Sequence, residues 1–168
     1  MSISDHSNLH GLVAFRLAGA RFALPVEAVA EVVPIAELGH PPELPAVVEG
    51  LLNLAGEAVP VLRLDRLLGL AEGRYGLDAS ILVLKGQPRT ALLVEHVDAV
   101  LAAADLVVLP VAADRSFNGC VAAQLEAGGG ILHLLVPERL LLEEERLRLA
   151  TFTQRTRERL LERWGDGA

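Results

Sequence analysis

The chain has 168 residues, of which 52% are hydrophobic, 22% are charged and only 4% are aromatic. A chain of this length can bury a core without disulfides or metal ions, and its composition excludes intrinsic disorder. The formal net charge of -7 and the scarcity of aromatic rings argue against a nucleic-acid surface, which needs basic and base-stacking side chains.

The cellular compartment is indicated by what the sequence lacks. Cys120 is the single cysteine, so an intrachain disulfide or a cysteine-based zinc site is impossible. The first ten residues lack the basic and apolar regions of a signal peptide, and no uninterrupted apolar run reaches the roughly 18 residues of a membrane span. We therefore expect a cytoplasmic protein that does not insert directly into a membrane.

Most of the chain is predicted to form short β-strands. After a flexible tail over residues 1–10, apolar runs alternate with glycine and proline, which is typical of β-barrels and sandwiches. The predicted strands cover residues 12–17, 21–25, 31–35, 47–54, 58–64, 80–84, 89–94, 97–101, 106–111, 120–125 and 131–136. Between them we expect helical turns at 27–29 and 65–68, a proline loop at 40–45 and a polar linker at 71–78.

The chain also contains an internal repeat. Residues 23–32 match residues 91–100 at an offset of 68, with six of the ten positions identical. Residues 61–64 align with residues 131–134 at an offset of 70. A Leu-Leu pair follows each segment, at 67–68 and, after a small insertion, at 140–141. Two copies predict two related subdomains rather than a solenoid. Chance similarity in a chain rich in Ala, Val and Leu is the alternative.

No catalytic or metal-binding set is recognisable. None of the five serines lies in a Gly-x-Ser-x-Gly elbow, and outside the tail no two histidines have metal-binding spacing. Cys120 lies in an apolar run, which favours a buried and inert thiol. We therefore expect that the protein is not an enzyme and that it binds no cofactor or metal.

A long helix is predicted over residues 138–164, because Pro137 suits a first helical position and Gly165 suits a stop. Its last turns combine a basic stripe with an apolar patch, made by Arg155, Arg159, Leu160, Leu161, Arg163 and Trp164. This pattern fits a partner-binding or self-association helix. The alternatives are a helix folded over a barrel and an exposed charged helix.

One segment carries a resemblance to a known family. Residues 50–70 read GLLNLAGEAVPVLRLDRLLGL, and further matching segments are FRLAG at 15–19, the block 26–33, LLVEHV at 92–97 and LLVPERLL at 134–141. Together they resemble the CheW family, the scaffold proteins of bacterial chemosensory arrays. The resemblance covers residues 9 to 142.

The resemblance implies a mainly-β fold, in which two SH3-like five-stranded β-barrel subdomains surround a shared apolar core and a C-terminal helix follows. It implies a CheW-like domain over residues 11–142, whose second subdomain begins near residue 78, and a helical extension over 143–168. It also implies a non-catalytic adaptor that couples the cytoplasmic tip of chemoreceptors to the regulatory domain of a CheA-type histidine kinase.

The resemblance further implies two sets of contact residues. The positions near the family's receptor groove are Val29, Glu31, Leu54, Ala91, Val97 and Val100. The positions in a loop that contacts kinase or receptor are Asn53, Ala55, Gly56 and Glu57. For each valine a core position is the alternative, and for the glutamate an ordinary solvated face is the alternative.

The sequence also departs from the family pattern. Ala55 stands where the family usually has Arg, and Arg63 stands where it usually has Asp. These departures leave two other functions open: a kinase-side accessory protein that does not bind receptors, or a small-molecule sensor that uses the cleft between the subdomains.

Overall fold

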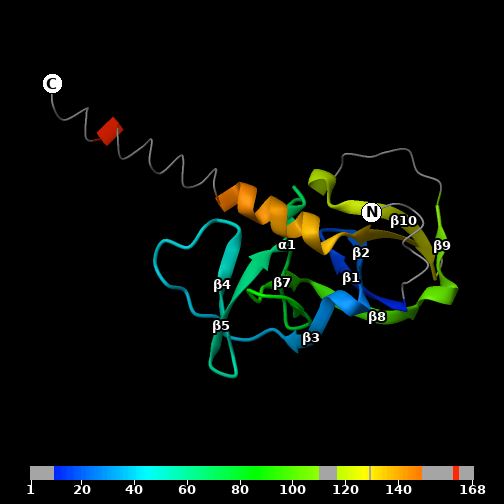
Figure 1. Cartoon of the computed structure of the whole chain (residues 1–168), viewed down its shortest axis with the longest axis horizontal. Coiled ribbons are helices and arrows are strands. Elements are labelled where there is room, and N and C mark those ends of the chain that lie inside the picture. The colour runs from blue at the N-terminus through cyan, green and yellow to red at the C-terminus, as the bar shows by residue number, and fades with distance from the viewer. Residues whose placement is uncertain (1–9, 110–116, 129, 149–160, 163–168) are drawn as a thin grey trace.

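The computed structural model describes residues 10–109, 117–128, 130–148 and 161–162. As predicted, these residues form mainly β-strands (Figure 1). The strands are β1 (Gly11–Leu17), β2 (Ala20–Pro25), β3 (Val29–Pro34), β4 (Val48–Leu54), β5 (Glu57–Arg63), β6 (Ser80–Leu84), β7 (Ala91–Val94), β8 (His96–Ala102), β9 (Val107–Val108), β10 (Val121–Ala127) and β11 (Gly130–Leu135). The short helical elements are η2 (Val26–Ala28), α1 (Leu64–Leu67), η3 (Ala103–Asp105) and η4 (Phe117–Gly119), and residues 137–148 form a longer helix.

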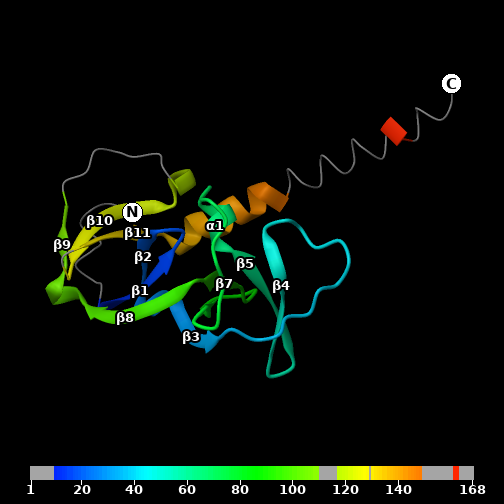
Figure 2. The same ribbon diagram turned by 180° about the vertical axis from the view of Figure 1, so that it is seen from behind.

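The strands form two mixed sheets: one continuous run of the chain, β3 to β7, forms the five-stranded sheet, and the strands before and after it form the other (Figures 1 and 2). The six-stranded sheet has the order β8-β1-β2-β11-β10-β9, and the five-stranded sheet has the order β3-β6-β7-β5-β4. The boundary predicted near residue 78 separates the two sequence repeats, but each sheet takes strands from both sides of it. This difference arises because the chain crosses between the sheets twice, from β2 to β3 and from β7 to β8.

The pairing of the strands supports the repeat and corrects its second offset. In the parallel pair of β2 and β11, Leu134 lies opposite Ala23, and in the parallel pair of β5 and β7, Val61 lies opposite Ala91. Since Ala23 and Ala91 are repeat-related, Val61 and Leu134 occupy equivalent places. The offset there is 73 residues, so the predicted offset of 70 is wrong by three.

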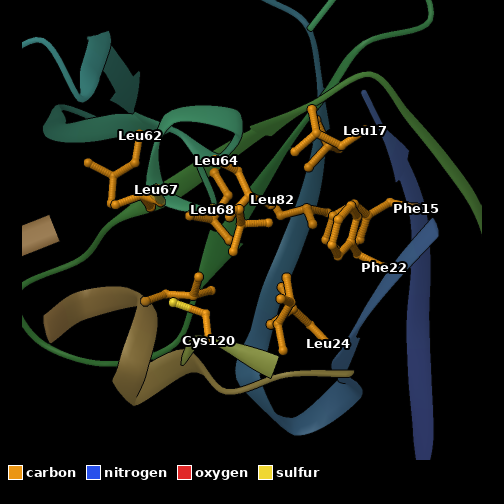
Figure 3. Packing of buried hydrophobic residues seen from close by; sticks show 14 of the residues in the cluster. Phe15, Leu17, Phe22, Leu24, Leu62, Leu64, Leu67, Leu68, Leu82 and Cys120 are labelled. Carbon is orange, nitrogen blue, oxygen red and sulfur yellow. The ribbon is translucent and has the colours of Figure 1, made fainter. Parts of the chain in front are cut away.

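Three apolar clusters form because the inner strands are covered on both faces; every residue of β7, for example, is buried. Successive side chains of a strand point to opposite sides of its sheet. On β1, Leu12 and Ala14 belong to a cluster within the six-stranded sheet, whereas Phe15 belongs to a larger central cluster. Figure 3 shows this central cluster, in which Phe15 and Phe22 pack with leucines that come from both sheets. The predicted core, shared by two β-subdomains, is therefore confirmed.

The helix over residues 137–148 is the counterpart of α1 at the offset of 73. Leu67 of α1 and Leu140 of this helix are both fully buried in the central cluster. The helix α1 ends after one turn, close to Gly69 with a φ of 69°, a conformation that favours glycine. The equivalent residue in the C-terminal helix is Leu142, and that helix continues through residue 148.

Candidate protein-binding surfaces

The two crossings between the sheets create two exposed sheet edges. Within the described ranges, β3 pairs only with β6 and β8 pairs only with β1, so both are edge strands. Figures 1 and 2 place these two strands along the same side of the molecule. An edge strand offers unpaired backbone groups and alternate side chains to a partner.

Four of the six predicted groove residues lie on these edge strands. Val29 on β3 and Val97 on β8 are repeat-related, and both are half-buried against the central cluster. Glu31 on β3 is exposed, and Val100 on β8 is 69% exposed. Among these four residues, the two edges therefore present apolar side chains together with the carboxylate of Glu31; the second carboxylate on the edges, Asp98 on β8, is paired with Arg16 and Arg21.

The other two predicted groove residues lie elsewhere. Ala91 is fully buried opposite Val61, in the cluster within the five-stranded sheet. Its assignment to a binding groove is therefore corrected, because a residue without exposed surface cannot contact a partner. Leu54 lies on β4 at the opposite edge of the five-stranded sheet from β3, and is half-buried against the same cluster.

The predicted contact loop is the exposed tip of the β4–β5 hairpin. Ala55 and Gly56 form its two-residue turn, with φ values of 51° and 88°. The side-chain oxygen Oδ1 of Asn53 accepts a hydrogen bond from the Gly56 N–H at 2.9 Å. Asn53, Ala55, Gly56 and Glu57 are all exposed, so the structure brings these four residues together on one surface.

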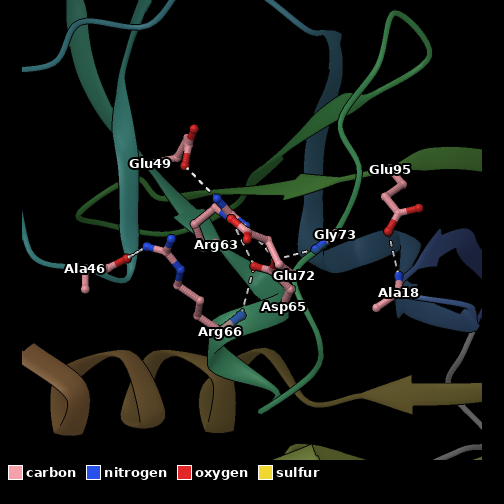
Figure 4. Close-up of polar contacts among 9 residues, drawn as sticks. All are labelled: Ala18, Ala46, Glu49, Arg63, Asp65, Arg66, Glu72, Gly73 and Glu95. Carbon is pink, nitrogen blue, oxygen red and sulfur yellow. Dashed lines mark hydrogen bonds and ion pairs between the residues drawn. The ribbon is translucent and has the colours of Figure 1, made fainter.

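At the end of β5, Arg63 forms a buried network of ion pairs (Figure 4). Its guanidinium binds Asp65 through two hydrogen bonds, of 3.0 and 2.7 Å, and binds Glu49 at 3.1 Å. The guanidinium carbon also lies 4.9 Å from the centre of the Tyr75 ring. Asp65 in turn accepts the Gly73 N–H at 2.9 Å, so the network fastens the linker between the repeats to α1.

The charges in this network stabilise each other. Burial by itself would raise the pKa of Asp65, but the hydrogen bonds from Arg63 and Gly73 outweigh it and lower that pKa. The hydrogen bond to Asp65 raises the pKa of Arg63. Sequence analysis identifies Arg63 only as a departure from the family, because its partners are spread from residue 49 to residue 75.

The described residues show little reactive chemistry. Burial raises the pKa of the Cys120 thiol to about 11, so the nucleophilic thiolate is scarce at neutral pH. In these residues no group of three or more His, Cys, Asp or Glu side chains is placed to hold a metal ion. No helix within the same ranges is both long and apolar enough to cross a membrane.

Comparison with known proteins identifies the family. A model of the CheW-like domain matches residues 11–145. The chain belongs to the CheW-like domain family. Among solved structures it is similar to the scaffolding protein TtCheW from Thermoanaerobacter tengcongensis, with a TM-score of 0.68 and 22% sequence identity over 78% of this chain and 86% of that chain. At this identity the likeness shows the fold alone, and no curated protein sequence matches the chain.

The CheW-like match stops at residue 145, whereas the C-terminal helix continues at least to residue 148. Of the residues predicted to form a partner-binding helix beyond it, Leu161 is 67% exposed. The other five lie outside the described residues: Arg155, Arg159, Leu160, Arg163 and Trp164.

Relative to the usual CheW-like pattern, the hairpin tip carries no cation. Ala55 presents only a methyl group there, and its positive φ is set by the turn rather than by a partner. Glu57 supplies the charge of the tip, with Arg89 at a distance of 3.9 Å. The carboxylate at the tip is therefore paired with a cation from the segment between β6 and β7.

Proposed function

We propose that the protein is a non-catalytic adaptor of a bacterial chemosensory array, where it couples chemoreceptors to a CheA-type histidine kinase at the inner face of the membrane. Membership of the CheW-like family supports an adaptor role. The observation that carries the proposal further is the pair of edge strands, with Val29 and Val97 in repeat-related places. An apolar surface flanked by a carboxylate suits the amphipathic helix of a receptor tip.

In this proposal the two partners bind at separate surfaces. The receptor tip contacts β3 and β8 through Glu31 and Val100, and the regulatory domain of the kinase contacts the β4–β5 hairpin tip around Glu57. Separate surfaces would allow one adaptor molecule to hold both partners at once. The same separation makes the proposal testable, because a substitution on one surface must leave binding at the other unchanged.

The test is calorimetric titration of the full chain with receptor-tip fragments and with the regulatory domain of the host's CheA-type kinases. We expect binding of both in the micromolar range. The substitutions Val100→Glu and Glu31→Arg, both at exposed positions, should weaken receptor binding about tenfold or more without weakening kinase binding. Glu57→Arg should weaken kinase binding selectively. Ile131→Glu is the matched control, since Ile131 is 51% exposed on β11.

The outcomes separate the competing functions. Kinase binding without receptor binding would identify a kinase-side accessory protein. Binding of neither partner at high micromolar concentration would contradict the adaptor proposal and leave only the fold. The melting temperature of each variant must equal that of the wild type, so that a loss of binding cannot be caused by a loss of folding.

A further inference from the structure

An open pocket of about 310 Å³ lies on the β4–β5 hairpin, where the segment over residues 37–39 runs beside β4. Two backbone hydrogen bonds of 2.8 Å between Gly39 and Leu51 hold this segment against β4. The lining residues are Glu37, Gly39, Leu51, Leu52, Asn53, Gly56 and Ala58. Ligand pockets usually measure about 300–1,000 Å³, so this one suits a side chain rather than a large cofactor.

The lining selects for a particular kind of side chain. Glu37 is the charged residue of the pocket and is exposed, while Leu51 and Ala58 supply apolar surface. No lysine or arginine is among the described residues that line it. A guanidinium on a long apolar stem matches this combination, because the stem packs on carbon and the planar head pairs with a carboxylate.

The charge of the chain is divided between its body and its C-terminal segment. Residues 1–145 carry nineteen acidic and nine basic side chains, a net charge of -10. Residues 146–163 carry six arginines and two glutamates, a net charge of +4. The C-terminal segment is therefore complementary in charge to the rest of the chain.

Most of the described residues of the C-terminal segment are exposed. The counterpart of the C-terminal helix, α1, ends at Gly69, but the C-terminal helix passes the equivalent Leu142, which is 64% exposed. The helical stretch at 161–162, red in Figure 1, lies apart from both sheets in both views, and Leu161 is 67% exposed. The described residues 161–162 are therefore open to contact by another molecule.

We propose that the pocket beside Glu37 binds an arginine from residues 155–163 of a second copy of the chain. The apolar stem would lie on Leu51 and Ala58, and the guanidinium would pair with the Glu37 carboxylate. The pocket and the segment are different surfaces, so the contact is head to tail. Such a contact joins copies into rings or open chains.

The test is sedimentation velocity of the full chain over a range of concentrations. The mass of the wild type should rise above that of the 17.9 kDa monomer as concentration increases, and added salt should reverse the rise. Glu37→Arg should raise the concentration needed for half-association about tenfold or more, because it places like charges together. The double substitution Arg155→Glu with Arg159→Glu should act in the same way.

A mixing experiment tests the head-to-tail geometry. The Glu37→Arg variant keeps an intact C-terminal segment, and the Arg155→Glu/Arg159→Glu variant keeps an intact pocket. Their mixture can form a single competent contact per pair of molecules, so we expect association that stops at the dimer. Glu126→Arg is the matched control, because Glu126 is an exposed acid on β10 far from the pocket lining in sequence and sheet.

Three results would overturn the proposal: a wild type that stays monomeric at millimolar concentration, association unaffected by Glu37→Arg, or a mixture that does not associate. Glu37 is exposed and outside the three apolar clusters, so its substitution does not threaten folding. The pocket lining shares Asn53 and Gly56 with the proposed kinase surface, so the binding of receptor and kinase fragments is measured separately, on dilute monomer. Failure of the self-association therefore leaves the adaptor proposal intact, and the reverse also holds.

Discussion

The two repeats differ in the residues and helix that follow their last strand and cover the end of the sheet; we call this region the closure. Arg63 at the end of β5 and Val136 just after β11 are related by the offset of 73, and both are buried. The arginine binds Asp65 and Glu49 and is followed by a helix of four residues. The valine is followed by a helix of at least twelve residues. A one-turn helix beside a buried ion pair and a much longer helix thus occupy equivalent positions in the fold.

The difference in helix length indicates which interactions stabilise each closure. The single turn of α1 buries Leu64 and Leu67 but has little further surface to bury, and the ion pairs add a fastening to the linker through Gly73. The C-terminal helix packs through Leu140, and its Arg139 donates a hydrogen bond of 3.0 Å to the Gly119 carbonyl before β10. Both closures therefore use apolar packing, but the ion pair beside α1 is buried at both ends, whereas the ion pairs of the C-terminal helix have exposed arginines.

The largest expected effect is the loss of the buried ion pair. Arg63→Met leaves the Asp65 carboxylate buried without its guanidinium, which costs about 3–5 kcal/mol of unfolding free energy. Urea denaturation followed by circular dichroism measures this loss. The control is Arg89→Met, since Arg89 pairs only weakly with Glu57 at 3.9 Å, and we expect a change within about 0.5 kcal/mol. Equal stability of the two variants would show that the network does not support the five-stranded sheet.

The two closing helices can be compared directly through their equivalent leucines. Leu67→Ala and Leu140→Ala each remove a fully buried side chain from the central cluster, and each should cost about 2–5 kcal/mol. Thermal and urea denaturation of both variants gives the comparison. A cost below about 1 kcal/mol for Leu140→Ala would mean that the C-terminal helix contributes little to the core.

The hairpin turns offer a smaller test of equivalence. Ala55 and Gly128 occupy the same place at the offset of 73, with φ values of 51° and 57°. A side chain at positive φ is strained, so Gly128→Ala should destabilise the protein by about 1 kcal/mol. Ala55→Gly should have the opposite sign and a smaller size, about 0.5 kcal/mol, because glycine loses more backbone entropy on folding. The melting temperatures of both variants test this prediction. Stability changes of the same sign in the two variants would contradict the equivalence of the turns.

Local patterns predict the strands, the repeat and the central core because apolar runs and turn residues act over a few positions. The sheet that β3 and β8 each join could not be predicted in this way, since the local sequence of either strand would suit both sheets. The burial of Ala91 was missed for the same reason: a small apolar residue in an apolar strand fits either face. The Arg63 network was missed because it joins residues up to 14 positions apart through side-chain geometry.

The smallest expected effect concerns Glu144, one of two buried carboxylates whose pKa values shift in opposite directions. Burial raises the pKa of Glu144 on the C-terminal helix, and the nearby Arg148 only partly offsets this. Its charged form therefore destabilises the folded state, and the penalty appears as the pH rises from the unfolded pKa through the higher folded pKa. Glu144→Gln should raise stability at pH 7 by less than about 1 kcal/mol, and the gain should vanish near pH 4.

For Asp65, the pH dependence of stability has the opposite sign. Its lowered pKa means that its charged form stabilises the folded state above the unfolded pKa, and that this stability is lost as the pH falls through the folded pKa. Asp65→Asn should therefore destabilise the protein at pH 7, with a smaller effect in acid. Melting temperatures of both variants between pH 3 and pH 8 test the pair. A Glu144→Gln variant less stable than the wild type at pH 7 would show that the ion pair with Arg148 outweighs burial, and that paired charge supports both closures.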